Sequence, residues 1–145
     1  RGIVDDRPGF LARFFQDFYN VDKLGGTRIS DAAVQLSWKV GAGASAAATL
    51  ACVSAWLTDF RDDLSLIKVP TLVFHGDADR IVPFEASGKR THELIGGSRL
   101  VVIKGGPHGL NWTHAAELNH ALLDFLKIVS AATPARAKKA AKRKH

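Results

Sequence analysis

The chain has 145 residues, of which 46% are hydrophobic and 23% are charged, a composition typical of one globular domain with a substantial core. Its one cysteine excludes an internal disulfide framework. No apolar run approaches the ~20 residues that cross a bilayer, and the opening RGIVDDRPGF lacks the features of a signal peptide. We therefore expect a cytoplasmic protein that makes no membrane contact.

The net charge of +6 is located in the last segment, residues 131–145, which has six Lys and Arg residues and no acid. The other basic residues balance the 14 acidic ones, so the rest of the chain is neutral. A basic Ala/Lys tail after a proline is usually solvated and disordered, and it sometimes binds phosphate weakly. The second interpretation makes a binding module for polyanions the alternative to an enzyme.

Residues 5–64 predict helices. The stretch DDRPGFLARFFQDFYN begins with Asp and Pro, and its apolar residues recur at helical spacing. A second helix should begin at Ser30 and Asp31. Residues 45–57 are Ala-rich and apolar on most sides, which predicts a helix packed against others. Cys52 in that helix is expected to be a buried structural thiol.

The pattern changes after Ile67. The run TLVF after Pro70 predicts a buried parallel strand that ends at His75 and Gly76, and residues 99–103 predict a second strand. Between them, residues 84–95 predict a helix closed by two glycines. Thr113 is expected to cap a last helix. The order strand, helix, strand, helix predicts an α/β fold with a right-handed crossover.

The loops after the two strands carry the candidate site. They read HGDADRIVP and KGGPHGL, and the carboxyl ends of parallel strands meet at one edge of a sheet. Asp79 and His108 should therefore lie side by side, with the carboxylate on Nδ1 of the ring and Nε2 left as a base. The alternative is a structural ion pair. Asp77 is expected to bind backbone amides in its turn.

Two stretches, PTLVFHGDADRIVPFEASG and LVVIKGGPHGLNWTHAAELNHALLDFL, resemble the α/β-hydrolase family, in its branch of cofactor-free (non-haem) haloperoxidases and esterases. The motifs are H-G-x-x-D-x-x-V-P and P-H-G-L-x-W-T-H, and the resemblance covers most of residues 70–126. It implies the carboxyl-terminal part of that fold. Residues 1–65 would be a helical cap, residues 66–130 the core with the acid and base, and residues 131–145 the basic tail.

The same resemblance implies acyl transfer, with Asp79 as the acid and His108 as the base of a Ser-His-Asp triad. The substrate would be an ester or a small carboxylic acid. In the haloperoxidase branch, hydrogen peroxide intercepts the acyl-enzyme and gives a peracid that oxidises halide, without haem, metal or another cofactor. Trp112 would either line the mouth of the pocket or pack at the start of the last helix.

The sequence departs from the family in one respect. It contains no G-x-S-x-G elbow, so the nucleophile and the oxyanion hole are expected to come from a missing amino-terminal half. Ser45 in GAGASAAAT follows no predicted strand and is not expected to act as the nucleophile. This chain alone is expected to be inactive, and its open strand edge should pair with the complementary half or with another copy.

The remaining histidines are expected to be structural. His75 should be buried or hydrogen-bonded, whereas His92, His114 and His120 should lie on solvated helix faces. No pair has a metal-binding spacing, and we predict no metal site.

Overall fold

The structure is a computed structural model that describes residues 2–132, so the predicted basic tail lies outside the described residues except for residues 131 and 132. The described helices are α1 (Gly2–Asp5), α2 (Arg7–Tyr19), α3 (Val21–Leu24), α4 (Asp31–Gly43), α5 (Ala46–Ala55), α6 (Arg61–Leu64), the 3₁₀ helix η1 (Phe84–Ala86), α7 (Gly88–Leu94), α8 (Leu110–Thr113) and α9 (Ala115–Ala132). The described strands are β1 (Leu72–Gly76) and β2 (Arg99–Ile103).

The first layer is helical, as the sequence predicted. The Asp6 carboxylate accepts a hydrogen bond from the Gly9 amide and caps α2, and Ser30 caps α4 in the same way. The apolar stripe of α2 then packs against α4. The buried and half-buried residues of this layer are Phe15, Phe18, Tyr19, Val21, Leu24, Ile29, Ala33 and Val34.

Helix α5 corrects one expectation. It forms within the predicted range, but none of its residues is buried in the described chain, and Cys52 is exposed. The expectations of a packed helix and a buried thiol were therefore wrong. An apolar composition shows that a helix has surface to bury, whereas the elements that cover it are decided elsewhere in the fold.

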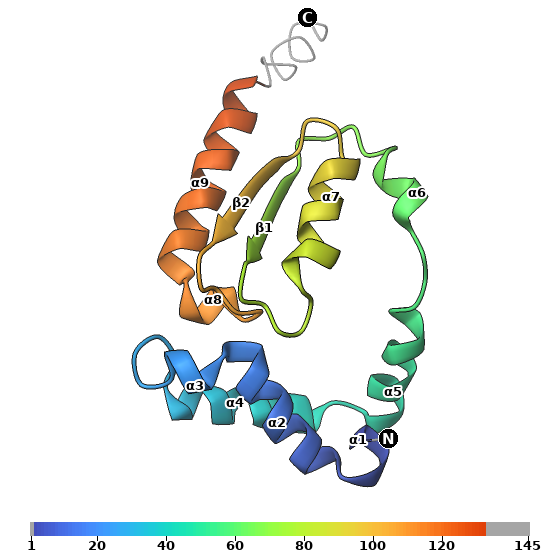
Figure 1. Cartoon of the computed structure of the whole chain (residues 1–145), viewed down its shortest axis with the longest axis vertical. Coiled ribbons are helices and arrows are strands. Elements are labelled where there is room, and N and C mark those ends of the chain that lie inside the picture. The colour runs from blue at the N-terminus through green and yellow to red at the C-terminus, as the bar shows by residue number, and fades with distance from the viewer. Residues whose placement is uncertain (1, 133–145) are drawn as a thin grey trace, which may run out of the picture.

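The second layer is a small parallel sheet between helices, which confirms the predicted α/β unit. β1 and β2 pair in the register Leu72 with Arg99 through Gly76 with Ile103. Helices α7 and α9 flank the sheet, and α7 forms the crossover (Figure 1). The carboxyl ends of both strands point toward the layer of α2, α3 and α4 (Figure 1).

The chain between β2 and the last helix differs from the prediction. A short helix, α8, intervenes, and α9 begins only at Ala115. Thr113 is therefore not the cap of α9. Its hydroxyl donates to the carbonyl oxygen of Gly109 at 3.1 Å and accepts from Nδ1 of His114 at 2.9 Å.

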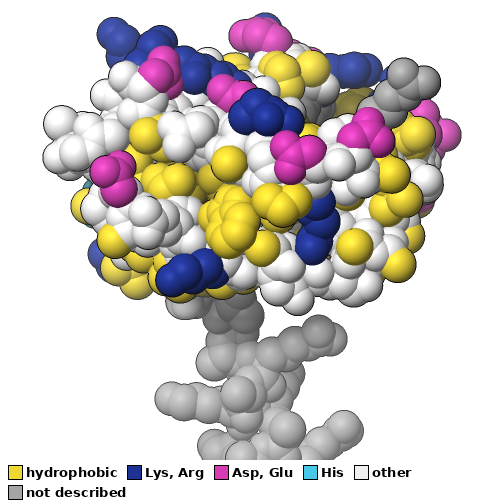
Figure 2. Space-filling model, turned by 90° about the horizontal axis from the view of Figure 1, so that it is seen from below, with side chains coloured by type: hydrophobic (Ala, Val, Ile, Leu, Met, Phe, Trp, Pro, Cys, Tyr) yellow, Lys and Arg dark blue, Asp and Glu magenta, His cyan; other side chains and the backbone are white. Residues whose placement is uncertain are grey.

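Helices α2, α3 and α4 lie at the lower end of the molecule in Figure 1. Viewed from below, hydrophobic side chains lie there with acidic and basic side chains scattered among them (Figure 2). None of the helices within residues 2–132 combines the length and the apolar character that a bilayer crossing requires.

Candidate active site

The candidate acid, Asp79, is held in the turn after β1. Its side chain is only 4% exposed. Oδ1 accepts hydrogen bonds from the amides of Ile81 and Val82, both at 2.8 Å, and Oδ2 faces two imidazoles. Both carboxylate oxygens therefore lie beside N–H groups of the two loops and of β1.

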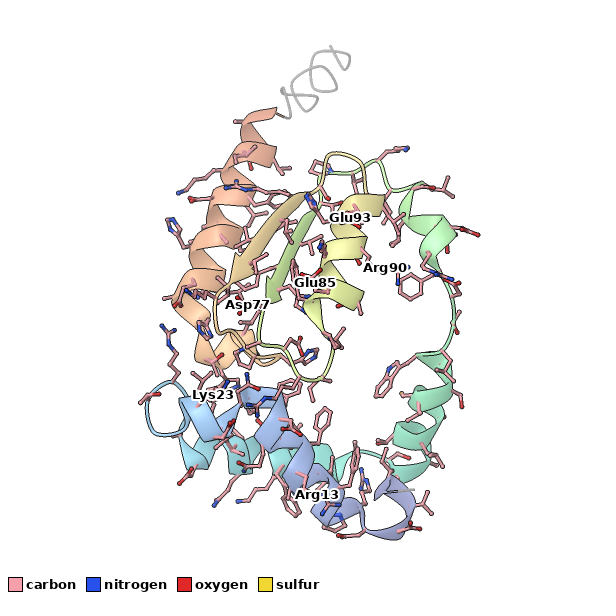
Figure 3. All side chains as sticks on the ribbon, viewed as in Figure 1. Arg13, Lys23, Asp77, Glu85, Arg90 and Glu93 are labelled. Atoms are coloured by element: carbon pink, nitrogen blue, oxygen red, sulfur yellow. The ribbon has the colours of Figure 1, made fainter. Side chains whose placement is uncertain are left out.

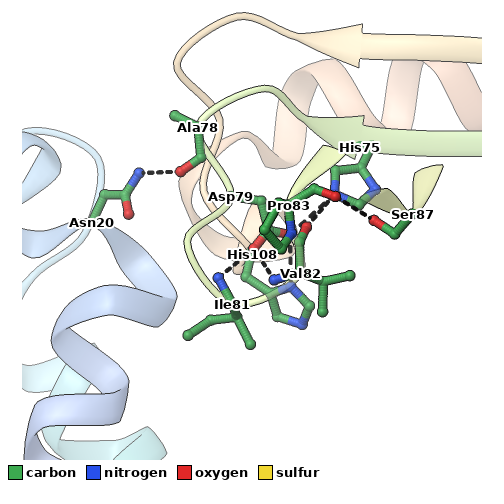
Figure 4. Close-up of polar contacts among 9 residues, drawn as sticks. All are labelled: Asn20, His75, Ala78, Asp79, Ile81, Val82, Pro83, Ser87 and His108. Carbon is green, nitrogen blue, oxygen red and sulfur yellow. Dashed lines mark hydrogen bonds and ion pairs between the residues drawn. The ribbon is translucent and has the colours of Figure 1, made fainter. Parts of the chain in front are cut away.

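The candidate base, His108, lies in the neighbouring loop after β2. Its Nδ1 lies 2.8 Å from Oδ2 of Asp79, so the ring donates from Nδ1 to the carboxylate (Figure 4). This bond fixes the tautomer and leaves Nε2 without a proton when the ring is neutral. The ring has the orientation and the protonation pattern that a general base requires.

Backbone contacts bring the two loops together. The amide of Ala78 donates to the carbonyl of Gly106, and the amide of Asp77 donates to the carbonyl of Ile103, both at 3.1 Å. The Asp77 carboxylate accepts from the amide of Gly105 at 2.6 Å. Asp77 thus binds a backbone amide, as predicted, although in the neighbouring loop. It lies where the edge of the sheet faces the helical layer (Figure 3).

Glycines permit this close approach. A Cβ on Gly76 would overlap the backbone of Gly106, and Gly105 has a φ of 71°, in the left-handed region. Gly105 and Gly106 of the second loop therefore allow the two loops to approach each other, which the sequence pattern alone did not reveal.

The free side of His108 faces an apolar pocket of about 530 Å³. Within residues 2–132 no hydrogen bond to its Nε2 is formed, and 34% of the side chain is exposed. Phe18 presents its ring to the imidazole at a centroid distance of 4.8 Å. The other residues that line the pocket are Phe14, Trp56, Ile81 and Val82.

Trp112 lies away from this pocket. It belongs to α8, is 48% exposed and lines two cavities that His108 does not reach, one with Tyr19 and one with Arg28. The helical turn after Gly109 directs its indole toward the α2–α4 layer. The structure therefore does not bring Trp112 to the mouth of the His108 pocket; the residues that line cavities with it belong to the helical layer.

The other candidates have structural partners. The Ser45 hydroxyl accepts from the amide of Ala48 and caps α5, and helix α4 precedes it instead of a strand. His75 is hydrogen-bonded, as predicted. His92 is half-buried and bonds to Ser98, whereas His120 is exposed and lies 3.2 Å from Asp124. Within the part of the chain that the structure describes, no group of three His, Cys, Asp or Glu side chains could hold a metal ion.

His114 contradicts its predicted exposure. Only 5% of it is exposed, and Arg28 from the helical layer bonds to the carbonyl of the preceding Thr113 and to Glu117. Burial lowers the pKa of this imidazole from its ordinary value of 6.5, and the nearby positive charge of Arg28 lowers it further.

Three contacts that sequence reasoning missed tie the helical layer to the two loops. Asn20 donates from Nδ2 to the carbonyl of Ala78 at 2.9 Å, and Gly109 donates its amide to the carbonyl of Phe18 at the same distance. Arg80 forms two hydrogen bonds with Asp22 at 2.8 and 3.0 Å, and these lower the pKa of that carboxyl.

Asn20 had a recognisable signal. It is 1% exposed, has a φ of 49° and ends α2 in the left-handed conformation. Asparagine after the last apolar residue of a helical stripe is typical of such a helix end. The pattern could have predicted the turn, but not its partner 58 residues away.

The sequence and the fold of the chain were compared with those of known proteins. No protein-family model matches the chain. It is 58% identical over 127 residues to a "Putative non-heme chloroperoxidase" of Synechocystis sp. (strain ATCC 27184 / PCC 6803 / Kazusa), which covers 88% of this chain and 46% of the relative. It is 35% identical over 135 residues to a bifunctional esterase/perhydrolase of Acinetobacter calcoaceticus, over 86% of this chain and 49% of the relative.

Solved structures agree. The crystal structure of a bromoperoxidase from Bacillus anthracis superposes with a TM-score of 0.82 at 49% identity, over 87% of this chain and 46% of that protein. The chain thus spans about half the length of the relatives that it matches. It belongs to the α/β-hydrolase family, in the group of non-haem haloperoxidases and esterases, and it represents a carboxyl-terminal portion of that fold.

Proposed function

We propose that this chain supplies the acid and the base of a Ser-His-Asp triad that transfers acyl groups. The observation that carries the proposal is the 2.8 Å contact between Oδ2 of Asp79 and Nδ1 of His108 at the edge of the sheet. In this arrangement Asp79 orients the ring and stabilises the imidazolium that forms, while Nε2 of His108 accepts a proton.

The nucleophile is a serine that this sequence does not contain in a G-x-S-x-G context. We propose that a complementary amino-terminal half carries it, together with the oxyanion hole. The serine hydroxyl gives its proton to Nε2 as its oxygen attacks the acyl carbon, and the leaving group then takes that proton from the imidazolium. Water or hydrogen peroxide next gives its proton to Nε2 and attacks the acyl-enzyme. The bond between the acyl carbon and the serine oxygen then breaks, the serine oxygen takes the proton back from the imidazolium, and a carboxylic acid or a peracid leaves.

The pocket beside His108 favours an apolar acyl group. Its lining residues other than His108 are apolar, and three of them are aromatic. An aliphatic or aromatic acyl chain would gain about 25 cal/mol for each Å² of apolar surface that it buries there. Short esters such as p-nitrophenyl acetate are suitable probes of this reaction.

A complementation experiment tests the proposal. The chain is mixed with the amino-terminal half of the Synechocystis relative, and hydrolysis of p-nitrophenyl acetate is followed. Turnover should appear only in the mixture and should disappear with His108→Ala. Asp79→Asn should lower kcat by about 10⁴-fold, because an amide holds the wrong tautomer of the ring.

The matched control is His120→Ala, which removes an imidazole whose side chain is 82% exposed on α9. It should leave turnover unchanged. A mixture that keeps its full rate with His108→Ala would show that the base has been assigned to the wrong residue.

The polyanion-binding alternative depends on residues 131–145, which lie almost entirely outside the described residues. No contact of the described chain favours it.

A further inference from the structure

His75 lies directly beside the candidate acid, although the sequence suggested only a structural group. It is the fourth residue of β1, and its side chain is 13% exposed. Its Nε2 lies 2.9 Å from the carbonyl oxygen of Val82 and 3.3 Å from Oδ2 of Asp79 (Figure 4). The oxygen that accepts from His108 thus lies between two imidazoles.

The partner of Nε2 determines where the proton of this ring is. A carbonyl oxygen can only accept, so Nε2 of His75 carries a hydrogen and donates it to Val82. The positive end of that N–H group lies beside Oδ2 of Asp79 and attracts the carboxylate. His75 and His108 therefore present opposite ring nitrogens, Nε2 and Nδ1, to the same carboxylate.

Val82 connects His75 to the other oxygen of the acid. The amide of Val82 donates to Oδ1 of Asp79 at 2.8 Å, while its carbonyl accepts from His75. The amide and the carbonyl of Val82 are therefore both hydrogen-bonded, and these two bonds fix the turn beside the Asp79 carboxylate.

The imidazole of His75 is itself held in place. Gly88, the first residue of α7, leaves room for it, because a Cβ there would lie 2.5 Å from Nδ1 of His75. The ring of Phe84 lies on another side, at a centroid distance of 5.6 Å. The Ser87 hydroxyl donates to the carbonyl of Pro83 at 2.7 Å and fixes the chain that follows the turn.

We propose that His75 is a positioning residue of the triad: its Nε2–H group holds the Asp79–Val82 turn so that Oδ2 points at Nδ1 of His108. His75 thereby keeps His108 in the tautomer whose Nε2 faces the pocket. The role of His75 in catalysis rests on the proposed function, but its effect on the tautomer of His108 can be measured without any turnover.

The test is NMR of the full 145-residue chain with ¹⁵N-labelled histidine, at a pH where the rings are neutral. Only this chain is labelled, so the spectrum reports its six histidines both alone and bound to an unlabelled complementary half. His108 should be in the Nδ1–H form. His75→Met keeps the size of the side chain but removes the donor, and His108 should then shift toward the Nε2–H form that free imidazoles prefer.

His75→Gln is the conservative variant, because its amide nitrogen can take the place of Nε2. It should keep His108 in the Nδ1–H form. His75→Asn is polar but too short to reach Val82, and it should behave like His75→Met. If His75→Met does not fold, the comparison of Gln with Asn decides the question.

The control is His92→Met, which removes a half-buried imidazole of α7 that bonds to Ser98 instead of Asp79. A general loss of stability would speed amide exchange throughout β1 and β2, whereas loss of positioning should speed it several-fold at Val82 and Ile81. An unchanged His108 tautomer in folded His75→Met or His75→Asn overturns the proposal. Failure of the complementation experiment would leave this readout intact and would refute only the proposed function.

Discussion

The side-chain amide of Asn20 donates a hydrogen bond of 2.9 Å to the carbonyl oxygen of Ala78, the residue that precedes Asp79. The donor ends α2 in the helical layer, and the acceptor lies in the turn that holds the candidate acid. Asn20 and Ala78 are 58 positions apart in the chain. This contact makes the position of the acid depend on the helical layer as well as on the sheet.

Two substitutions of Asn20 separate this hydrogen bond from the backbone conformation. Asn20→Gly should lower the free energy of unfolding by about 1 kcal/mol, because it loses the bond but accepts the φ of 49°. Asn20→Ala should cost about 1–2 kcal/mol more, because an alanine is strained in the left-handed region. Urea unfolding followed by circular dichroism measures both, and equal effects of the two variants would contradict the role of the left-handed turn.

Gly76→Ala should be severely destabilising, by about 3 kcal/mol or more, because the new Cβ would overlap the backbone of Gly106 and push the two loops apart. Thermal unfolding measures the loss. The matched control is Gly43→Ala at the end of α4, where a Cβ meets no atom within 4 Å. The free energy of unfolding of that variant should stay the same or rise by up to about 1 kcal/mol, because alanine favours the helix more than glycine does. Similar melting temperatures for the two variants would mean that the loops do not approach as closely as described.

Stability should fall as the pH drops below about 6.5, in part because of His114. Its pKa is lowered in the folded chain from 6.5, so on acidification the unfolded chain binds a proton at this ring before the folded chain does. The contribution of His114 is fully present above the unfolded pKa and is lost as the pH falls through the folded pKa.

His114→Gln should therefore make the free energy of unfolding less dependent on pH between 7 and 5 than it is in the unsubstituted chain. Urea titrations at several pH values measure the slope. His120→Gln, which removes an exposed imidazole on α9, is the control and should change the slope less. A His114→Gln chain with the original slope would refute this assignment.

The isolated chain should associate with itself. Within residues 2–132 β1 pairs only with β2, and parallel sheets are normally covered on all sides. Exposed leucines on α9 add apolar surface, among them Leu123 at 57% and Leu126 at 48%. Light scattering after size exclusion should find oligomers at micromolar concentration, and adding the complementary half should replace them with a one-to-one complex.

Leu126→Lys should weaken self-association, because it places a charge in the apolar surface of α9. Asn119→Lys adds the same charge at an exposed polar position of the same helix and should have a smaller effect. A chain that is monomeric at every concentration, with a cooperative thermal transition well above room temperature, would refute the prediction.

The sequence predicted the parts of the fold that depend on local pattern. The spacing of apolar residues located α2 and α4, and the two β-rich runs located β1 and β2 within one or two residues. The proximity of Asp79 and His108 could also be predicted, because parallel strands joined by a crossover helix end at the same edge of a sheet. The motifs around both residues then agreed with that topology.

Burial could not be predicted in the same way. Cys52 was expected inside and is exposed, and His114 was expected outside and is 5% exposed. For Cys52 on α5, a helical pattern shows which side chains share a face, but not which other element covers that face. His114 lies instead in the turn between α8 and α9, where the structure interrupts the helix that the sequence predicted.

The sequence by itself therefore determined the α/β unit, the order of its elements and the identity of the two residues brought to its edge. Only the tertiary structure decided how that edge is held: by Asn20 and Asp22 from the helical layer, by the close approach of Gly76 to Gly106, and by His75 beside the carboxylate. Local propensity acts between neighbours in the chain, whereas these contacts join residues that become neighbours only after the layers have packed.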